Sequence, residues 1–403
     1  MSDCCIIGGG VIGLSLAREL AGRGRSVRLL ARDQRRDTAS WAAAGILPPA
    51  PLFPGCSPGE ALTAWSDRLH RVWAAELRAE TGIDTGLEAC GGLHVAADDG
   101  GLARLADEAA TWRSRGAACE WLDPAPLVAL EPALAGAVDR GAIRGGFLLP
   151  GEMQLRPPRH LAALEHSCLA RGAVISRAAE AVDFIPQGGR IAAVVATVDG
   201  TVETVRADTF VLAAGAWSEA IAAKLGLAIA TRPIRGQIAL LRLPRQPLGR
   251  VVNRGLDYLV PRTDGRLLAG STIEDAGFDR GTSPDAIERL LEVAADLLGN
   301  LPGTVVEQAW AGLRPGSADG LPWIGRCPAF SNTFVAAGHF RAGLHQSTGT
   351  AMMLADMIEN RAPELDPRPF APDRPPAGPG SDAVADYIAR AAASSMRPAV
   401  TRR

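Results

Sequence analysis

The chain has 403 residues, of which 47% are hydrophobic and 21% charged, and its formal net charge is −2. This length suits two domains better than one core, and the charge balance argues against general affinity for nucleic acid or anionic lipid. No apolar run reaches the roughly 18 residues of a membrane-spanning helix, and the start lacks the basic segment of a signal peptide. The seven cysteines are scattered without metal-ligand spacing, so we expect no metal site and a reducing, cytoplasmic compartment.

The beginning of the chain combines an apolar strand, a glycine-rich turn and a helix. Within residues 4–20 an apolar run leads into the sequence GGGVIG and then into a stretch of helical periodicity. Strand, G-x-G-x-x-G and helix in this order form a dinucleotide-binding fingerprint. Gly8 permits the tight turn, Gly10 lets the backbone approach a pyrophosphate, and Gly13 lets the helix lie close to the strand. The helix N-terminus then faces the phosphate charge.

A second strand is predicted at residues 26–30, where dinucleotide-binding folds carry an acidic residue for the ribose. Ala31 occupies that position here, Arg32 follows it, and Asp33 comes two residues late. Either Asp33 reaches the ribose or this contact is missing. An arginine at this place also suits a 2′-phosphate, so a nicotinamide-binding module stays open as an alternative.

The remaining elements alternate with turn residues along the chain. Helices are predicted at 60–80, 101–115, 284–298 and from about 343 to 359. Strands are predicted at 92–97, 146–149, 174–176, 191–198, 201–206, 210–213, 237–243, 257–261, 266–270, 305–311 and 333–336. After residue 361 the chain is rich in Pro, Ala and Gly, and we expect a surface helix at 382–392 and no catalytic role for this tail.

Several further segments carry a resemblance to a known family. They are the small-residue run 39–47 (ASWAAAGIL), the strand and turn 211–218 (VLAAGAWS), and the segments 258–262 (YLVPR), 312–315 (GLRP) and 338–343 (GHFRAG). In this order and spacing, over about residues 4–361, the chain resembles the D-amino acid oxidase family of FAD-dependent amine oxidases. Within that family the likeness is greatest to the glycine oxidase branch.

The resemblance implies an α/β fold with a Rossmann-type FAD-binding domain and a second α+β substrate domain built on a mostly antiparallel sheet. It implies a discontinuous FAD-binding domain at 1–85, 145–220 and 325–365, a substrate-binding domain at 86–144 and 221–324, and a C-terminal tail at 366–403.

The resemblance also implies oxidative deamination of glycine and other small amines, such as sarcosine and short D-amino acids. A hydride passes from the substrate carbon to flavin N5, and molecular oxygen then reoxidises the flavin to give hydrogen peroxide. The substrate leaves as an imine or 2-oxo acid with ammonia, and a role in thiamine biosynthesis follows from the same likeness. A dehydrogenase of this family that passes electrons to a quinone stays open as an alternative, and so does assembly into a homo-oligomer.

Three residues are expected at the substrate. Arg314 matches the family position that binds the substrate carboxylate, and the planar guanidinium fork also fixes which Cα–H bond faces the flavin. Tyr258 resembles the family residue whose hydroxyl makes a second carboxylate contact, and Arg341 positions the substrate or its loop. The competing interpretations are a surface arginine, a tyrosine that merely packs in a sheet, and an arginine that only stabilises the loop.

FAD is expected to bind without a covalent bond, because no cysteine lies near residues 312–314, where related sarcosine oxidases attach flavin. The helix predicted from Gly343 would point its positive end at the charge that develops on the reduced flavin. His339 contributes there through its side chain or only through its backbone. The expected cofactor-binding residues are Gly8, Gly10, Val11, Ile12, Gly13, Ala31, Arg32, Asp33, Ala39, Ser40, Ala44, Gly45, Ile46, Val182, Gly215, Trp217, Gly338, His339, Phe340, Arg341, Ala342, Gly343, Leu344 and His345.

Overall fold

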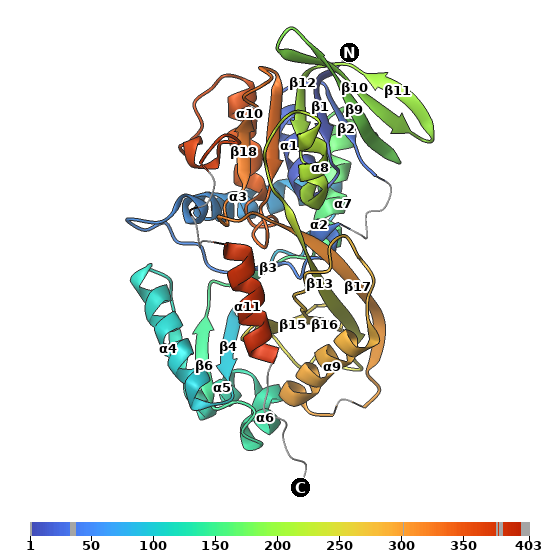
Figure 1. Cartoon of the computed structure of the whole chain (residues 1–403). Helices are drawn as coiled ribbons and strands as arrows, with labels where there is room; N and C mark the ends of the chain where they lie inside the picture. The colour runs from blue at the N-terminus through green and yellow to red at the C-terminus, as the bar shows by residue number, and fades with distance from the viewer. Residues whose placement is uncertain (1, 33–37, 301, 376–377, 379–381, 396–403) are drawn as a thin grey trace.

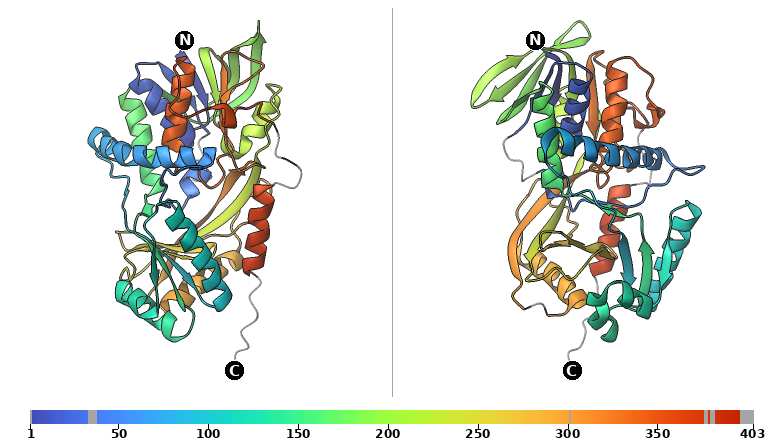
Figure 2. Two further views of the ribbon diagram at one scale, coloured as in Figure 1. Left: turned by 90° about the vertical axis from the view of Figure 1, so that its left-hand side faces the viewer. Right: turned by 180° about the vertical axis from the view of Figure 1, so that it is seen from behind.

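Two sheets organise the computed structural model, which describes residues 2–32, 38–300, 302–375, 378 and 382–395. In Figure 1 the upper half holds a six-stranded sheet that carries both the start and the end of the family-like region. The lower half holds an eight-stranded sheet built mainly from the middle of the chain. Figure 2 shows the same division from the side and from behind.

The six-stranded sheet is parallel except at one edge. Its order is β18 (Trp323–Arg326), β19 (Thr333–Ala337), β12 (Ala207–Leu212), β1 (Ser2–Ile7), β2 (Val27–Leu30) and β8 (Val174–Ser176). Only the pairing of β18 with β19 is antiparallel. Residues 4–7 of the central strand β1 are buried on both faces of the sheet, which explains why that run is continuously apolar rather than alternating.

Each face of this sheet has its own cover. Helices α1 (Val11–Gly22), α3 (Pro58–Thr81), α7 (Pro157–Ala170) and α10 (Ser347–Ile358) pack on the face that includes Cys4 and Ile6. A three-stranded sheet of β9 (Ala179–Gln187), β10 (Arg190–Val198) and β11 (Thr201–Val205) packs on the face that includes Cys5 and Ile7. The alternation of strand side chains therefore divides the core in two.

The eight-stranded sheet is antiparallel except for one pair. Its order is β17 (Val305–Gly316), β13 (Arg232–Arg242), β16 (Arg266–Gly270), β15 (Asp257–Pro261), β14 (Val251–Arg254), β4 (Gly92–Ala96), β6 (Gly145–Leu149) and β5 (Glu120–Leu122), with β14 and β4 parallel. Its helices are α4 (Asp99–Ser114), α5 (Pro124–Leu130), α6 (Ala135–Asp139) and α9 (Pro284–Leu298).

The remaining described elements are short segments and one helix near the C-terminus. They are α2 (Ala39–Ala42), the pair β3 (Ile46–Leu47) with β7 (Met153–Gln154), α8 (Ser218–Ala223) and α11 (Ala383–Ser395), with single 3₁₀ turns at Pro132–Leu134, Gly215–Trp217 and Arg368–Phe370. No helix in the described part of the chain is both long enough and apolar enough to cross a membrane.

The expected fold class is confirmed: a mixed parallel sheet with a nucleotide-type turn stands beside a mostly antiparallel sheet. The domain boundaries remain a prediction. The pairing of β6 with β4 and β5 favours moving the boundary at residue 145 beyond Leu149. The helix expected at 382–392 forms as α11, with exposed residues on one side, and its Val384 and Tyr387 are buried.

Candidate active site

A cavity of about 1090 Å³ lies between the two halves of the molecule and is lined by both. This volume lies slightly above the usual range of about 300–1,000 Å³ for small-molecule sites. The first glycine turn, the small-residue run, the 338–345 loop and strand β17 meet at this cavity. All of the predicted site residues in the described part line the cavity except Gly13 and Val182.

The glycine turn needs its glycines for close packing. Gly8 has a φ of +124°, and its amide donates to the carbonyl of Leu30 over 2.9 Å. A Cβ at Gly13 would stand 1.9 Å from the carbonyl oxygen of Gly8, so only glycine lets α1 lie this close to the turn. Gly10 is the N-cap of α1 and offers no side-chain cap, which leaves the end of the helix open to a phosphate.

The small-residue run is fixed at several points by hydrogen bonds. The Ser40 hydroxyl accepts from the amide of Val11 over 2.9 Å, which ties α2 to the start of α1. The Trp310 indole donates to the carbonyl of Ala42 over 3.1 Å. Arg262, buried in the substrate half, donates to the carbonyl of Ala44 over 2.6 Å. The run thus presents small side chains and a fixed backbone to the cavity.

The ribose end of the cavity differs from the expected pattern. Ala31 and Arg32 line it, and the Arg32 guanidinium lies 4.0 Å from the centre of the Trp217 ring. Asp33 lies outside the described residues, so its contact with a ribose stays a prediction. Val182 is exposed, and its carbonyl accepts from the Lys224 ammonium, which itself lines the cavity.

Polar contacts of its own buried histidines hold the 338–345 loop in place. α10 begins at Ser347 rather than near Gly343, and the residues before it form successive turns. The His339 ring lies 3.0 Å from the Thr350 hydroxyl, and burial lowers the pKa of His339 to about 3. His345 pairs with Asp67 over 2.9 Å.

His70 on α3, in the half with the six-stranded sheet, also supports this loop. The His70 Nε2–H donates to the carbonyls of Leu344 and His345 over 3.1 and 2.8 Å. Burial, assisted by His345, lowers the pKa of His70 to about 4. The loop is therefore anchored through its backbone by a neutral imidazole.

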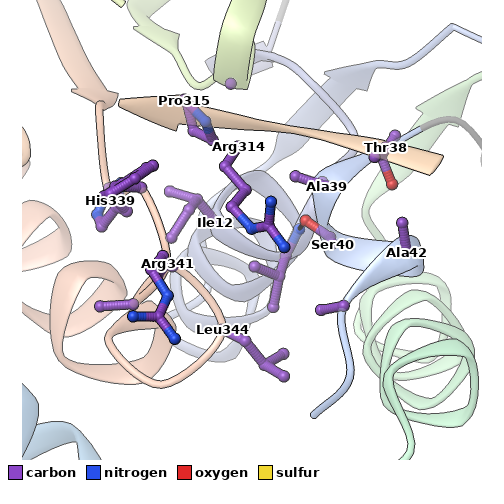
Figure 3. Close-up of a pocket in the computed structure, with 18 of the residues that line it drawn as sticks. Ile12, Thr38, Ala39, Ser40, Ala42, Arg314, Pro315, His339, Arg341 and Leu344 are labelled. Atoms are coloured by element: carbon purple, nitrogen blue, oxygen red, sulfur yellow. Dashed lines mark hydrogen bonds between the residues drawn. The ribbon is translucent and has the colours of Figure 1, made fainter. Parts of the chain in front are cut away.

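Arg314 extends from β17 into the cavity, as Figure 3 shows. Its Nη2 donates to the Ser271 hydroxyl over 2.8 Å, and its Nη1 donates to the carbonyl of Thr272 over 3.3 Å. A Cβ at Gly236, on the neighbouring strand, would stand 2.2 Å from the guanidinium. Gly236 therefore creates the space in which the guanidinium lies.

Tyr258 faces the same space from β15. A Cβ at Gly270 would stand 2.6 Å from its ring, so a second glycine makes room for a second side chain of the site. Burial raises the pKa of Tyr258, an effect that Tyr387 increases and that Arg314, Ser271 and Arg341 oppose. The phenol is thus neutral, and the guanidinium groups of Arg314 and Arg341 lie near it.

Arg341 is exposed on the 338–345 loop, and its guanidinium lies 4.6 Å from the centre of the Tyr387 ring. Tyr387 comes from α11, in the tail that the sequence interpretation set aside. Five residues that shape the site were missed from the sequence: Gly236, Arg262, Gly270, Ser271 and Tyr387. Arg262 stands inside the segment 258–262 that carries the family resemblance, whereas Ser271 and Tyr387 lie outside all of those segments.

Comparison with known proteins agrees with this geometry. The family described as FAD dependent oxidoreductase (DAO) matches residues 3–357. The chain belongs to this family. Its members carry FAD and catalyse oxidation, so this chain is an FAD-dependent oxidoreductase.

Individual relatives are similar over most of this chain. A glycine oxidase from Pseudomonas aeruginosa is 35% identical over 91% of this chain and 97% of its own. The crystal structure of glycine oxidase from Geobacillus kaustophilus superposes with a TM-score of 0.84, at 32% identity, over 93% of this chain and 99% of that one. A bifunctional ThiO/ThiG protein from Synechocystis is 31% identical over 93% of this chain, which spans 54% of that longer protein.

The residues of this oxidoreductase fit a flavin dinucleotide. The glycine turn leaves no room for a side chain beside the backbone, and α1 begins there without a side-chain cap. Small residues line the cavity between this turn and the guanidinium of Arg314. The family's flavin replaces the nicotinamide alternative that Ala31 and Arg32 had left open.

Proposed function

We propose that this chain oxidises glycine and other small amines, such as sarcosine and short D-amino acids, to imines. The imines hydrolyse to the 2-oxo acid and ammonia, or to the 2-oxo acid and methylamine when the substrate is sarcosine. Oxygen accepts the electrons and leaves as hydrogen peroxide. When bound, FAD supplies the two-electron acceptor for the Cα–H bond. The observation that carries the proposal is the Arg314 guanidinium, which lies in the same cavity as the nucleotide-type turn.

Arg314 is the residue that would bind the substrate carboxylate. Its guanidinium is planar, and its contacts with Ser271 and Thr272 fix the orientation of that plane. A carboxylate held by such a fork cannot rotate freely, so the clamp also orients the amine and the Cα–H bond. Tyr258 is neutral and can donate its hydroxyl hydrogen to the same carboxylate.

The histidines in the cavity wall are all engaged. His339 contacts Thr350, His345 contacts Asp67, and His94 contacts Glu152 over 3.3 Å. None of these three imidazoles is held ready to remove a proton from the substrate carbon. This arrangement supports direct hydride transfer from an amine that arrives in its neutral form.

We also propose that FAD is held without a covalent bond. No cysteine is among the described residues that line the cavity. Cys327 is buried, comes after Trp323 in the sequence and does not line the cavity. Acid precipitation of the purified protein should therefore release yellow flavin into the supernatant, and flavin that stays in the pellet would contradict this proposal.

A peroxide assay over glycine, sarcosine and small D-amino acids tests the proposed reaction. Peroxide production with glycine supports it. Reduction of an artificial dye by glycine, without oxygen consumption, would instead favour the dehydrogenase that passes electrons to a quinone. We further propose a place in thiamine biosynthesis, which rests on the glycine oxidase likeness and on the relative named ThiO/ThiG.

A further inference from the structure

Helix α11 lies outside the part of the chain that matches the family. The match ends at residue 357, whereas α11 spans Ala383–Ser395. Figures 1 and 2 show it running along one face of the molecule, beside the eight-stranded sheet. A segment of this kind has no role assigned by the family, so its contacts define what it does.

Specific contacts dock the start of α11 against β17 and the turn that follows it. The amide of Ala383 donates to the carbonyl of Ala318 over 2.8 Å. Val384 is 1% exposed, and its Cγ2 would stand 2.5 Å from a Cβ at Gly316, so the helix packs directly on the strand. Gly316 is two residues beyond Arg314 on β17. The docking site of α11 is therefore continuous with the carboxylate clamp.

Tyr387 projects from the next turn of α11 into the cavity wall. It is 8% exposed, and its ring meets Phe340 edge to face at 5.2 Å between centroids. The Arg341 guanidinium lies over the same ring, and Arg341 makes no hydrogen bond or ion pair within the described residues. A cation over an aromatic face is attracted by the negative charge on the face of the ring. The Tyr387 ring is thus the main contact that positions this guanidinium.

Phe340 makes the position of this loop sensitive to its neighbours. It is a non-glycine residue with a φ of +47°, a left-handed conformation that persists only where surrounding contacts enforce it. Its amide donates to the carbonyl of Pro315 over 2.9 Å on one side, and its ring meets Tyr387 on the other. The tyrosine of α11 therefore helps to hold both Phe340 and Arg341 against the substrate end of the cavity.

We propose that Tyr387 is a specificity-determining residue, whose ring closes the substrate end of the cavity, holds Arg341 in place and excludes carboxylates with bulky groups. The proposal rests on the proposed amine oxidation, because it assigns substrate to the space between Arg314 and Tyr258. Its prediction is a preference for small substrates that is set by α11, a segment beyond the family match.

Binding of simple carboxylates to the flavin-loaded protein tests this role without turnover. Acetate and phenylacetate are titrated while the flavin absorbance at about 450 nm is followed. In Tyr387→Ala we expect the ratio of acetate affinity to phenylacetate affinity to fall about 10-fold, because space opens and Arg341 loses its aromatic contact. Tyr387→Phe keeps the ring and should stay within about 2-fold of the parent, while Asp386→Asn, on the exposed side of the same helix, is the matched control.

Turnover separates positioning from a purely structural role. With glycine, Tyr387→Ala should raise KM about 5-fold and leave kcat within about 2-fold, because the ring acts on binding rather than on the chemical step. Tyr387→Leu retains a buried apolar side chain, so it keeps α11 docked if the alanine variant releases the helix to trypsin. An unchanged affinity ratio in both Tyr387→Ala and Tyr387→Leu would overturn the proposal. A parent that binds acetate but oxidises no amine would contradict the proposed function and leave this comparison readable.

Discussion

The two ends of the cavity are built in different ways. The flavin end uses backbone and small residues, and its key members Gly8, Gly13 and Ser40 come from short segments near the start of the chain. The substrate end uses long side chains, Arg314 and Tyr258, which distant strands bring together across the eight-stranded sheet. Loss of one side chain should therefore separate the two ends, so that substrate binding and cofactor binding fail independently.

The difference also explains what the sequence could reveal. The flavin end depends on local order, strand then turn then helix, and such order can be read from consecutive residues. The substrate end depends on register: Gly236 stands opposite Gly312, one strand away, and so makes room for Arg314. Register between strands far apart in sequence leaves no local pattern.

Three features illustrate the limit. The resemblance placed Arg314 in the site, but nothing in one sequence showed that Ser271 would orient its guanidinium. The strand at 305–311 was predicted too short, because residues 312–316 continue it through pairing with β13. Tyr387 was missed because its tail is rich in Pro, Ala and Gly, and only the docking of Val384 turns part of it into a wall of the cavity.

The largest effect is expected at the clamp. Arg314→Ala leaves the substrate carboxylate unpaired, which should lower kcat/KM for glycine on the order of 100-fold or more, or about 3 kcal/mol. Arg314→Lys should rescue only part of this loss, because an ammonium lacks the planar fork. Steady-state peroxide kinetics measure the effect, and flavin content per chain should stay at the parent level.

The exposed Arg242→Ala, on β13, is the matched control for this variant. Primary amines without a carboxylate should lose much less activity than glycine, since they do not use the clamp. If Arg314→Ala oxidises glycine within about threefold of the parent, Arg314 is not the clamp and Arg341 takes its place as the candidate.

Acid should act on the flavin end. Burial is the main cause that lowers the pKa of His70 to about 4 and of His160 and His339 to about 3. An unfolded histidine has a pKa of about 6.5. As the pH drops below this value, the unfolded chain therefore binds protons before the folded chain does. The free energy of unfolding falls from about pH 6.5 toward the pKa values of the folded state. Each such histidine lowers the free energy of unfolding by on the order of 2 kcal/mol or more as the pH falls through this window. Above about pH 6.5 the full stability is present and no longer changes with the state of these histidines.

Urea unfolding at several pH values between 7.5 and 5 measures this loss, in a range above the titration of most carboxylates. His70→Asn removes one of the buried imidazoles and should make the pH dependence shallower. A free energy of unfolding that stays constant from pH 7 to pH 5 would show that these histidines do not remain neutral and buried in the folded protein.

A smaller effect on substrate binding is expected from Gly236. Its substitution tests whether this glycine belongs to the substrate end or to the flavin end. In Gly236→Ala the added Cβ must displace the Arg314 guanidinium, so acetate should bind about 10-fold more weakly while flavin is retained. Gly100→Ala, where a Cβ meets its nearest atoms at 3.5 Å, is the control for the substitution itself. Loss of flavin from Gly236→Ala, with acetate binding unaltered in the remaining holoprotein, would show that this glycine belongs to the flavin end instead.

The smallest effect is expected from Ser40, which ties α2 to α1 through a single hydrogen bond. Ser40→Ala removes the acceptor of the Val11 amide, a loss of about 1 kcal/mol that corresponds to roughly fivefold weaker FAD binding. Ser176→Ala is the matched control, because that hydroxyl accepts from Arg28 and does not line the cavity. Equilibrium binding of FAD to the apoprotein measures the difference, and KM for glycine in the loaded variant should stay at the parent value. A raised KM with unchanged FAD affinity would mean that Ser40 acts on the substrate. Ser40 would then serve both ends of the cavity, although the structure places it at the flavin end.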